Sequence, residues 1–326
     1  MSLMTERDQL VDELRRSEKL LLTTHENPDG DALGSLLGMH LVLQQLGKDS
    51  VMFLAANQFP LPYEYQRMQL DEVRHELPDD VNERTVVFLD CGNIDRTPVH
   101  FLQNSHLHVL NIDHHHDNTR FGTVNLVVPE AACAAEIVYD LAKELRVEIT
   151  PEMAEALYIG LVTDTGKFQF ENTTPEAHAM AAELMEAGVA PQDVHRKLYE
   201  ELPYARLQLL ARALNNVHRF DGGAITLTHI EREDFTETGA AESDSEGIVD
   251  HMRQVEGTVM AGLVRELLEK DGQRKVSLRS TDGRVDVSII ARGLGGGGHR
   301  QAAGFTTDLP FDELVGRLRT EMAAQL

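Results

Sequence analysis

Histidines and aspartates in this sequence gather in four short segments that could together bind divalent metal ions. The first segment contains one histidine and two aspartates within seven residues, namely His25, Asp29 and Asp31. Burying such groups side by side without a counter-cation would cost several kcal/mol for each uncompensated charge, so a bound metal ion explains their proximity. A solvent-exposed Asn-Pro-Asp-Gly turn explains the same residues, because this composition is common in turns.

Three further segments place similar residues at the end of an apolar stretch. They are Asp90 after residues 85–89, the run Asp113, His114, His115 and His116 after residues 107–112, and Asp164 after residues 152–162. Singly, each has an ordinary explanation as a helix cap or a surface run, because short motifs often match by chance. An open α/β sheet gathers its site outside the carboxyl ends of its strands. We therefore expect the four segments to converge there.

The mixture of imidazole and carboxylate ligands narrows the choice of metal. Calcium sites are all oxygen, and structural zinc sites are rich in thiolates. The two cysteines, Cys91 and Cys133, are far apart and have no metal-binding spacing. We expect a borderline divalent ion, with Mn²⁺ as the first choice and Mg²⁺ or Co²⁺ as alternatives.

Composition limits the class of protein. The net charge of −24 argues against binding of long nucleic acid, because that affinity comes mainly from many Lys and Arg contacts with phosphates. A short anionic substrate remains compatible, since bound ions place positive charge at one spot. No apolar run approaches the roughly 20 residues that span a bilayer, and the amino-terminal residues do not resemble a signal peptide. Two unpaired cysteines fit a reducing compartment, so we expect a cytoplasmic protein.

The elements that must position these residues alternate between strands and helices. Strands are predicted at residues 20–24, 50–54, 85–89 and 107–112. Helices are predicted at residues 8–14, 30–46, 133–145 and 152–162. This alternation predicts an α/β domain with a parallel sheet.

The remainder of the chain shows a different order of predicted helices and strands. Helices that begin near a proline are predicted at residues 175–186, 191–200 and 203–216. Strands at residues 223–230, 258–264 and 275–279, with a helix within 309–326, predict a smaller mixed α/β domain. We expect a catalytic domain at residues 1–188, a helical linker at 189–216 and a substrate-binding domain at 217–326.

Four consecutive glycines in the second predicted domain precede a basic pair. Glycine permits positive φ and close backbone approach, so the run suits amides that point at an anion ahead of a helix N-terminus. A flexible glycine linker is the alternative, and the adjacent basic residues favour anion binding. The candidate substrate-binding residues are Arg279, Ser280, Gly296, Gly297, Gly298, His299 and Arg300.

The four segments resemble, in order and spacing, the motifs of the DHH phosphoesterase superfamily: His25-x3-Asp29-x-Asp31, Asp90-Cys91-Gly92, Asp113-His114-His115 and Thr163-Asp164-Thr165-Gly166. Residues 277–280 and 295–304 resemble the DHH-associated C-terminal domain, so the resemblance covers nearly the whole chain. The sequence is most similar to the nanoRNase/pAp phosphatase subgroup.

The resemblance implies a set of ligands for two ions. His25 and Asp29 would hold one ion, Asp31, His114 and Asp164 would hold the other, and Asp90 would bridge both. A hydroxide held between the ions would attack the phosphorus atom.

The resemblance also implies roles for the neighbouring histidines. His115 would donate a hydrogen bond to a non-bridging phosphate oxygen and stabilise charge in the transition state. Asp113 would orient a ligating imidazole, and His116 has no implied role. A shift of one position in this run would exchange the roles of His114 and His115. We keep the stated assignment because Asp113 marks the first residue of the motif.

The implied function is a metal-dependent phosphoesterase that hydrolyses very short oligoribonucleotides (nanoRNA) and 3′-phosphoadenosine 5′-phosphate. Relatives with the same motifs hydrolyse cyclic or linear dinucleotides such as c-di-AMP and pApA, which is the alternative substrate class. A catalytically silent nucleotide-binding module is an alternative of another kind, but such a module would not need the bridging Asp90. A homodimer is also compatible with the sequence.

Overall fold

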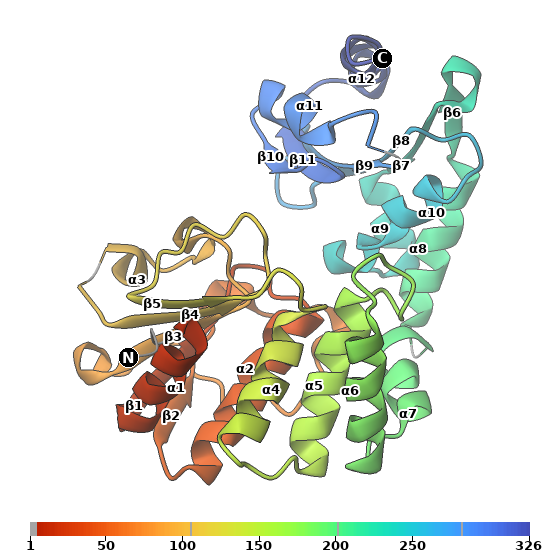
Figure 1. Ribbon diagram of the computed structural model, residues 1–326. Coiled ribbons are helices and arrows are strands. Elements are labelled where there is room, and N and C mark those ends of the chain that lie inside the picture. The colour runs from red at the N-terminus through yellow and green to blue at the C-terminus, as the bar shows by residue number, and fades with distance from the viewer. Residues whose placement is uncertain (1–4, 105, 201, 282) are drawn as a thin grey trace. The chain divides into compact units, whose positions relative to one another are not determined.

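The structure, a computed structural model, describes residues 5–104, 106–200, 202–281 and 283–326 (Figure 1). The chain divides into two compact units, Met1–Glu201 and Leu202–Leu326. The division falls within residues 189–216, the segment expected as a linker. All predicted metal ligands belong to the first unit, and the glycine run belongs to the second.

A parallel five-stranded sheet forms the centre of the first unit, as the sequence predicted. Its strand order is β2 (Asp49–Met52), β1 (Lys19–Thr23), β3 (Thr85–Leu89), β4 (Val109–Asp113) and β5 (Val124–Val127). Strands β1 and β3 are buried along almost their whole length, which is typical of a parallel sheet that is covered on both faces. Strand β5 was not predicted, because it is short, only partly buried and interrupted by an asparagine.

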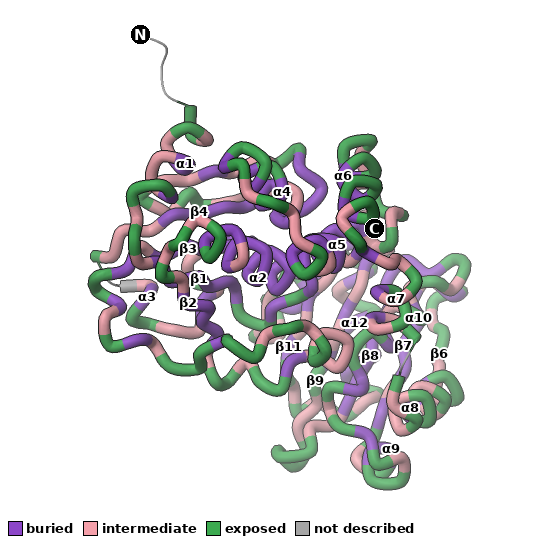
Figure 2. The backbone as a smooth tube through the Cα atoms, turned by 90° about the horizontal axis from the view of Figure 1, so that it is seen from below, coloured by how far each residue is buried: buried purple, intermediate pink, exposed green. Residues whose placement is uncertain are grey.

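Helices and short turns connect these strands. The helices are α1 (Glu6–Arg16), α2 (Gly30–Gln45), α3 (His100–Asn104), α4 (Ala134–Glu144), α5 (Pro151–Asp164), α6 (Pro175–Glu186) and α7 (Pro191–His195), followed by the π-helix η5 (Arg196–Glu200). The 3₁₀ turns are η1 (Ala56–Gln58), η2 (Tyr63–Tyr65), η3 (Val81–Glu83) and η4 (Ile94–Arg96). Figure 2 shows that α2 and α5 are buried for most of their length. Their inner position lets them carry functional groups toward the sheet edge.

The second unit contains a mixed six-stranded sheet, which confirms the smaller mixed α/β domain. Its order is β10 (Gly297–His299), β11 (Ala302–Thr307), β9 (Arg274–Ser280), β8 (Met260–Glu266), β7 (Ile225–Ile230) and β6 (His218–Phe220). Among the described residues of this sheet, only β7 and β8 pair in parallel. The helices are α8 (Tyr204–Asn215), α9 (Arg232–Thr238), α10 (Ile248–Arg253), α11 (Val287–Gly293) and α12 (Phe311–Ala323), with turns η6 (Asp221–Gly223) and η7 (Glu242–Ser245).

The glycine run does not precede a helix, so this expectation from the sequence was wrong. The run follows α11 and enters strand β10, which pairs antiparallel with β11. A Cβ at Gly298 would lie 2.6 Å from the carbonyl oxygen of Ala302, and one at Gly296 would clash with the carbonyl oxygen of Gly304. Gly298 also has a φ of 133°, which favours glycine. These glycines therefore permit the close approach of a tight hairpin.

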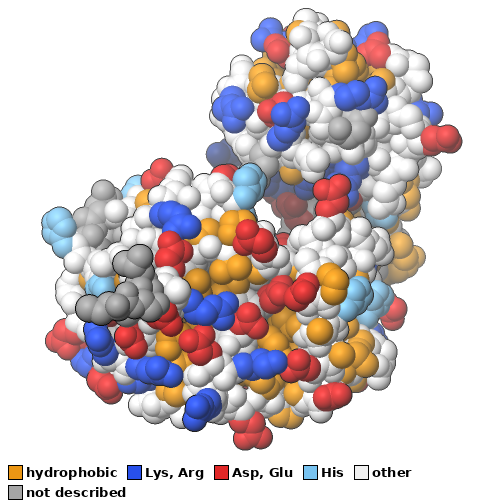
Figure 3. All heavy atoms as spheres, in the orientation of Figure 1, with side chains coloured by type: hydrophobic (Ala, Val, Ile, Leu, Met, Phe, Trp, Pro, Cys, Tyr) orange, Lys and Arg blue, Asp and Glu red, His pale blue; other side chains and the backbone are white. Residues whose placement is uncertain are grey.

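Charged side chains of both signs are mixed on the surface of the first unit. On the face shown in Figure 3, Lys and Arg side chains of the first unit are interspersed with Asp and Glu. Within the described parts of the chain, no helix combines the length and the apolar composition needed to cross a membrane.

Candidate metal centre

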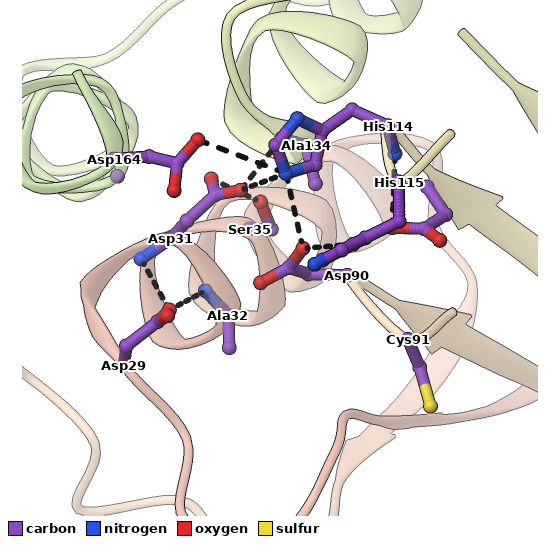
Figure 4. A network of polar contacts seen from close by, with 12 residues as sticks. Asp29, Asp31, Ala32, Ser35, Asp90, Cys91, His114, His115, Ala134 and Asp164 are labelled. Atoms are coloured by element: carbon purple, nitrogen blue, oxygen red, sulfur yellow. Dashed lines mark hydrogen bonds and ion pairs between the residues drawn. The ribbon is translucent and has the colours of Figure 1, made fainter. Parts of the chain in front are cut away.

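The carboxyl ends of three neighbouring strands bring the predicted segments together (Figure 4). His25 follows β1, Asp90 follows β3, and His114 and His115 follow β4. Asp164 approaches the same place from a helix, because it is the last residue of α5. The convergence at one sheet edge is the arrangement expected for an open α/β sheet.

The candidate ligands form three overlapping groups. In each group the ligand atoms lie within 4.8 Å of one another: His25 with Asp29 and Asp90, Asp31 with His114 and Asp164, and Asp90 with His114 and His115. The first two groups correspond to the two ion sites expected from the sequence. The third group contains His115, so exchange of roles between His114 and His115 remains an alternative.

Asp90 lies at the centre of these groups. Its Oδ1 atom is 3.5 Å from Nε2 of His114 and 3.4 Å from Nδ1 of His115, and its Oδ2 atom is 3.6 Å from Nε2 of His25. The residue is 2% exposed, and Oδ1 has no hydrogen-bond partner among the described residues. A buried carboxylate oxygen that faces imidazoles without a hydrogen bond fits a position beside a cation. The donor set therefore fits a divalent ion.

The backbone conformation and the pKa of Asp90 are both unusual. Its φ of 54° is rare for a residue with a side chain, and such outliers concentrate at functional sites. Burial acts to raise the pKa of Asp90, but His114 and His25 outweigh it and hold the pKa well below its usual value. The carboxylate is therefore ionised and available as a ligand at neutral pH.

Asp29 caps the amino end of helix α2 through one carboxylate oxygen. Its Oδ1 atom accepts hydrogen bonds from the backbone N–H groups of Asp31 and Ala32, each at 3.1 Å, so Asp29 is the N-cap. Asp29 is exposed, but desolvation by the protein atoms around its carboxyl group and the charge of Asp90 raise the pKa of Asp29. A raised pKa means that the ionised carboxylate is destabilised, and a cation bound beside Asp29 would offset this destabilisation.

The group on the other side of Asp90 is centred on His114. Its Nε2 atom is 3.9 Å from Oδ2 of Asp31 and 3.7 Å from Oδ2 of Asp164. Burial raises the pKa of Asp164 to about 6, although His114 acts to lower it. Asn172 also donates to the Asp164 carboxylate at 3.2 Å. No sequence motif pointed to Asn172, because this residue lies in a loop outside the four segments.

His115 is oriented by a polar network. Its Nδ1 atom is 2.8 Å from Oδ1 of Asp113, and the same oxygen accepts the backbone N–H of His114 at 2.9 Å. Asn118 donates to the other oxygen of Asp113 at 2.5 Å. An Nδ1–H bond to Asp113 leaves Nε2 of His115 free for another partner. Burial acts to lower the pKa of His115, but Asp113 and Asp90 outweigh it and raise the pKa.

His25 has a similar orienting contact and an unexpected neighbour. Its Nδ1 atom is 2.7 Å from the carbonyl oxygen of Glu26, which can accept the Nδ1 proton and leave Nε2 facing Asp90. Nη2 of Arg96 also lies 3.0 Å from Nδ1. Arg96 lies in turn η4, and no motif in the sequence drew attention to it.

The predicted substrate-binding residues lie on the sheet of the second unit. Arg279 pairs in register with Ala302 of β11, and its Nε atom is 3.4 Å from a carboxylate oxygen of Asp250. Arg300 donates to the carbonyl oxygen of Gly283 at 2.7 Å. Ser280 is buried. The side chain of His299 lies outside the described part of the structure.

Without bound ions, the first unit should lose stability as pH rises. Burial acts to lower the pKa of His114, but Asp90 and Asp31 outweigh it and raise the pKa from 6.5 to about 10. A raised pKa means that folding is favoured fully below pH 6.5 and that this stabilisation disappears as pH passes 10. We expect the Tm of chelated protein to fall across this window, and His114→Gln to remove most of the fall. A flat profile for the wild type in EDTA would contradict the assignment.

Comparison with known proteins identifies similar domains. Residues 19–161 match the DHH family, N-terminal domain, and residues 226–325 match the DHHA1 domain. The chain is 35% identical over 311 residues to the bifunctional oligoribonuclease and PAP phosphatase NrnA of Thermus thermophilus, which covers 93% of this chain and 90% of that protein. It is 28% identical to the protein of the same name from Bacillus subtilis, with 91% of each chain covered.

Solved structures show the same fold. An exopolyphosphatase-related protein from Bacteroides fragilis superposes with a TM-score of 0.90 at 24% identity, covering 99% of this chain and 98% of that chain. The exonuclease RecJ bound to manganese superposes with a TM-score of 0.54 at 13% identity, covering 100% of this chain and 95% of that chain. Both likenesses concern the arrangement of strands and helices.

Proposed function

Because this chain belongs to the DHH phosphoesterase family, in the group that contains the NrnA proteins, we propose that it hydrolyses very short oligoribonucleotides and 3′-phosphoadenosine 5′-phosphate in the cytoplasm. The observation that carries this proposal is the position of Asp90. Its two buried oxygens face His25 on one side and His114 on the other. A carboxylate in that position suits a bridge between two ions.

The ligand set supports two divalent ions, and we propose Mn²⁺ because imidazole and carboxylate ligands suit it. His25, Asp29 and Asp90 would hold one ion, and Asp31, His114, Asp164 and Asp90 would hold the other. Bound ions would activate a water molecule and stabilise the negative charge of the phosphoryl oxygens.

We propose that His115 contacts the reacting phosphate. Its raised pKa favours the protonated ring, in which Nδ1–H donates to Asp113 and Nε2–H is free to donate. A phosphate oxygen that accepts this second bond gains stabilisation as its charge grows in the transition state. Asn118 and Asp113 hold the ring so that little reorganisation is needed.

A second set of residues, in the second unit, is proposed to anchor the substrate. Arg300 is exposed in the turn that joins β10 to β11, and His299 and the glycines of the run are its neighbours in sequence. Arg279 and Ser280 lie on the adjacent strand β9, although Asp250 already engages part of the Arg279 guanidinium. We propose that this set binds a phosphate group of the substrate.

Arg300→Ala should therefore raise KM for dinucleotides by about tenfold and leave ion stoichiometry unchanged, as expected when a charged hydrogen bond of about 1.5 kcal/mol is lost. Hydrolysis of a small generic phosphodiester should change little. Arg317→Ala is the matched control, because Arg317 is an exposed arginine of the same unit that pairs with Glu321 on α12. Equal losses on both substrates would place Arg300 in the catalytic centre and contradict the anchoring role.

The proposed activity is tested by the metal dependence of hydrolysis. Purified full-length protein is assayed with pApA and 3′-phosphoadenosine 5′-phosphate in Mn²⁺, Mg²⁺, Co²⁺ or EDTA. We expect hydrolysis with divalent ions, the highest rate with Mn²⁺, and none in EDTA. Hydrolysis that survives complete chelation would overturn the metal-dependent mechanism.

A further inference from the structure

The carboxylate of Asp31 is held by the backbone of a distant helix. Its Oδ2 atom accepts the N–H of Ala134 at 2.6 Å, and its Oδ1 atom accepts the N–H of Ala135 at 2.9 Å. These are the first two amides of α4. Figure 4 shows Ala134 beside Asp31. Since Asp31 is only 1% exposed, these amides replace water as its partners.

The amino end of α4 needs such a partner. Its N-cap residue, Cys133, makes no side-chain hydrogen bond to the first turn within the described chain. The first amides of a helix have no intrahelical acceptor, and they carry a partial positive charge. Asp31, which lies in the first turn of α2, therefore supplies both the acceptor and the negative charge that the Cys133 side chain does not.

The space for this contact depends on Gly160 in helix α5. A Cβ at residue 160 would lie 2.7 Å from the Cβ of Ala135 and 2.9 Å from Oδ1 of Asp31. Because the Asp31 oxygen and the Ala135 amide are bonded to each other, a methyl group at residue 160 would press on both partners of this hydrogen bond. Helices α2, α4 and α5 therefore meet at a point that has no room for a side chain.

This meeting point lies next to one proposed ion site. Gly160 and Asp164 are four residues apart on α5 and so lie on the same side of that helix. Asp31 and Asp164 both face Nε2 of His114, at 3.9 Å and 3.7 Å. A displacement of Asp31 from α5 would change the spacing between two ligands of the same ion.

We infer that Gly160 and the amino end of α4 act together as positioning elements, which hold Asp31 in place as a ligand in the site of Asp31, His114 and Asp164. This inference rests on the proposed function, because the positioning matters only if ions bind. The atoms nearest to a Cβ at residue 160 belong to Ala135 and Asp31. The other ion site should therefore be affected less.

The test compares Gly160→Ala with Gly38→Ala in the full-length protein. A Cβ at Gly38 would also be crowded in the contact between α2 and α5, but it would meet side-chain atoms of Leu157 at 2.7 Å rather than a ligand. Both substitutions should lower the Tm, because both overfill a packed interface. The number and affinity of bound Mn²⁺ ions are measured by calorimetry at a temperature where all proteins are folded.

We expect Gly38→Ala to bind two ions as the wild type does, and Gly160→Ala to bind one of its two ions about 10- to 100-fold more weakly, the range for loss of a supporting contact. Two ions of unchanged affinity in Gly160→Ala would overturn the inference. Equal weakening in both variants would also overturn it, because general packing would then be the cause. A wild type that binds no ions would instead refute the proposed function.

A second variant covers the case in which Gly160→Ala does not fold. In the double variant Gly160→Ala with Ala135→Gly, the nearest carbon contact is removed, while the new methyl group still meets Oδ1 of Asp31. We expect this protein to fold and to show the same weakened site. Two ions of wild-type affinity in the folded double variant would also overturn the inference.

Discussion

Asp90→Ala is expected to abolish hydrolysis, with a loss of at least about 10⁴-fold in kcat, comparable to the removal of a central catalytic group in other hydrolases. The physical reason is that Asp90 faces both proposed ion sites, so its removal takes a ligand from each. The fold should persist, because Asp90 lies in a loop after β3 rather than in the hydrophobic core. Hydrolysis of pApA and circular dichroism measure the two effects separately.

Asp95→Ala is the matched control for Asp90→Ala. This substitution also removes one carboxylate, five residues after Asp90. The side chain of Asp95 is exposed and belongs to turn η4. We expect near wild-type rates for this control. Wild-type rates in a folded Asp90→Ala protein would refute a mechanism in which two ions share this carboxylate.

His115→Ala is expected to lower kcat by roughly 10²–10³-fold while two ions remain bound, because one transition-state hydrogen-bond donor is lost. Its effect should fall on kcat more than on KM, since the contact strengthens as phosphoryl charge develops. Stopped assays with pApA give the rate, and calorimetry gives the ion stoichiometry. The two measurements together separate a substrate contact from a ligand.

His116→Ala serves as the control for the same run of histidines. His116 is exposed and follows His115 directly, so its substitution tests whether any change in this run disturbs the site. We expect an active protein with two bound ions. If His115→Ala instead loses an ion, His115 is a ligand, and its role and that of His114 must be exchanged.

The convergence of the candidate ligands was predictable because parallel strands end at one edge of a sheet. His25, Asp90 and His114 each follow an apolar run that forms a central strand, and strand periodicity identifies such runs. The type of each residue then limits the chemistry to metal binding. The positions of these residues depend on local sequence patterns, so they could be predicted from the sequence.

Contacts that depend on packing between distant segments were not predictable. The amides of Ala134 and Ala135 donate to Asp31 from more than 100 positions away, and backbone amides have no sequence signature. Asn172 reaches Asp164 from a loop for the same reason. The glycine run was misread because glycine permits both an anion-binding turn and a close hairpin. Only the pairing with β11 distinguishes these two conformations.

The central claim, a phosphoesterase specific for very short RNA, is tested most directly by the dependence of kcat/KM on chain length. In Mn²⁺, the full-length protein is given pApA, RNAs of two to five nucleotides, 24-mers, 3′-phosphoadenosine 5′-phosphate, c-di-AMP and pyrophosphate in parallel. We predict that kcat/KM is highest for pApA and the shortest RNAs, that 3′-phosphoadenosine 5′-phosphate is hydrolysed, and that kcat/KM falls steeply for the 24-mer. Hydrolysis of the 24-mer as efficient as that of the dinucleotide, or hydrolysis of pyrophosphate alone, would contradict the claim.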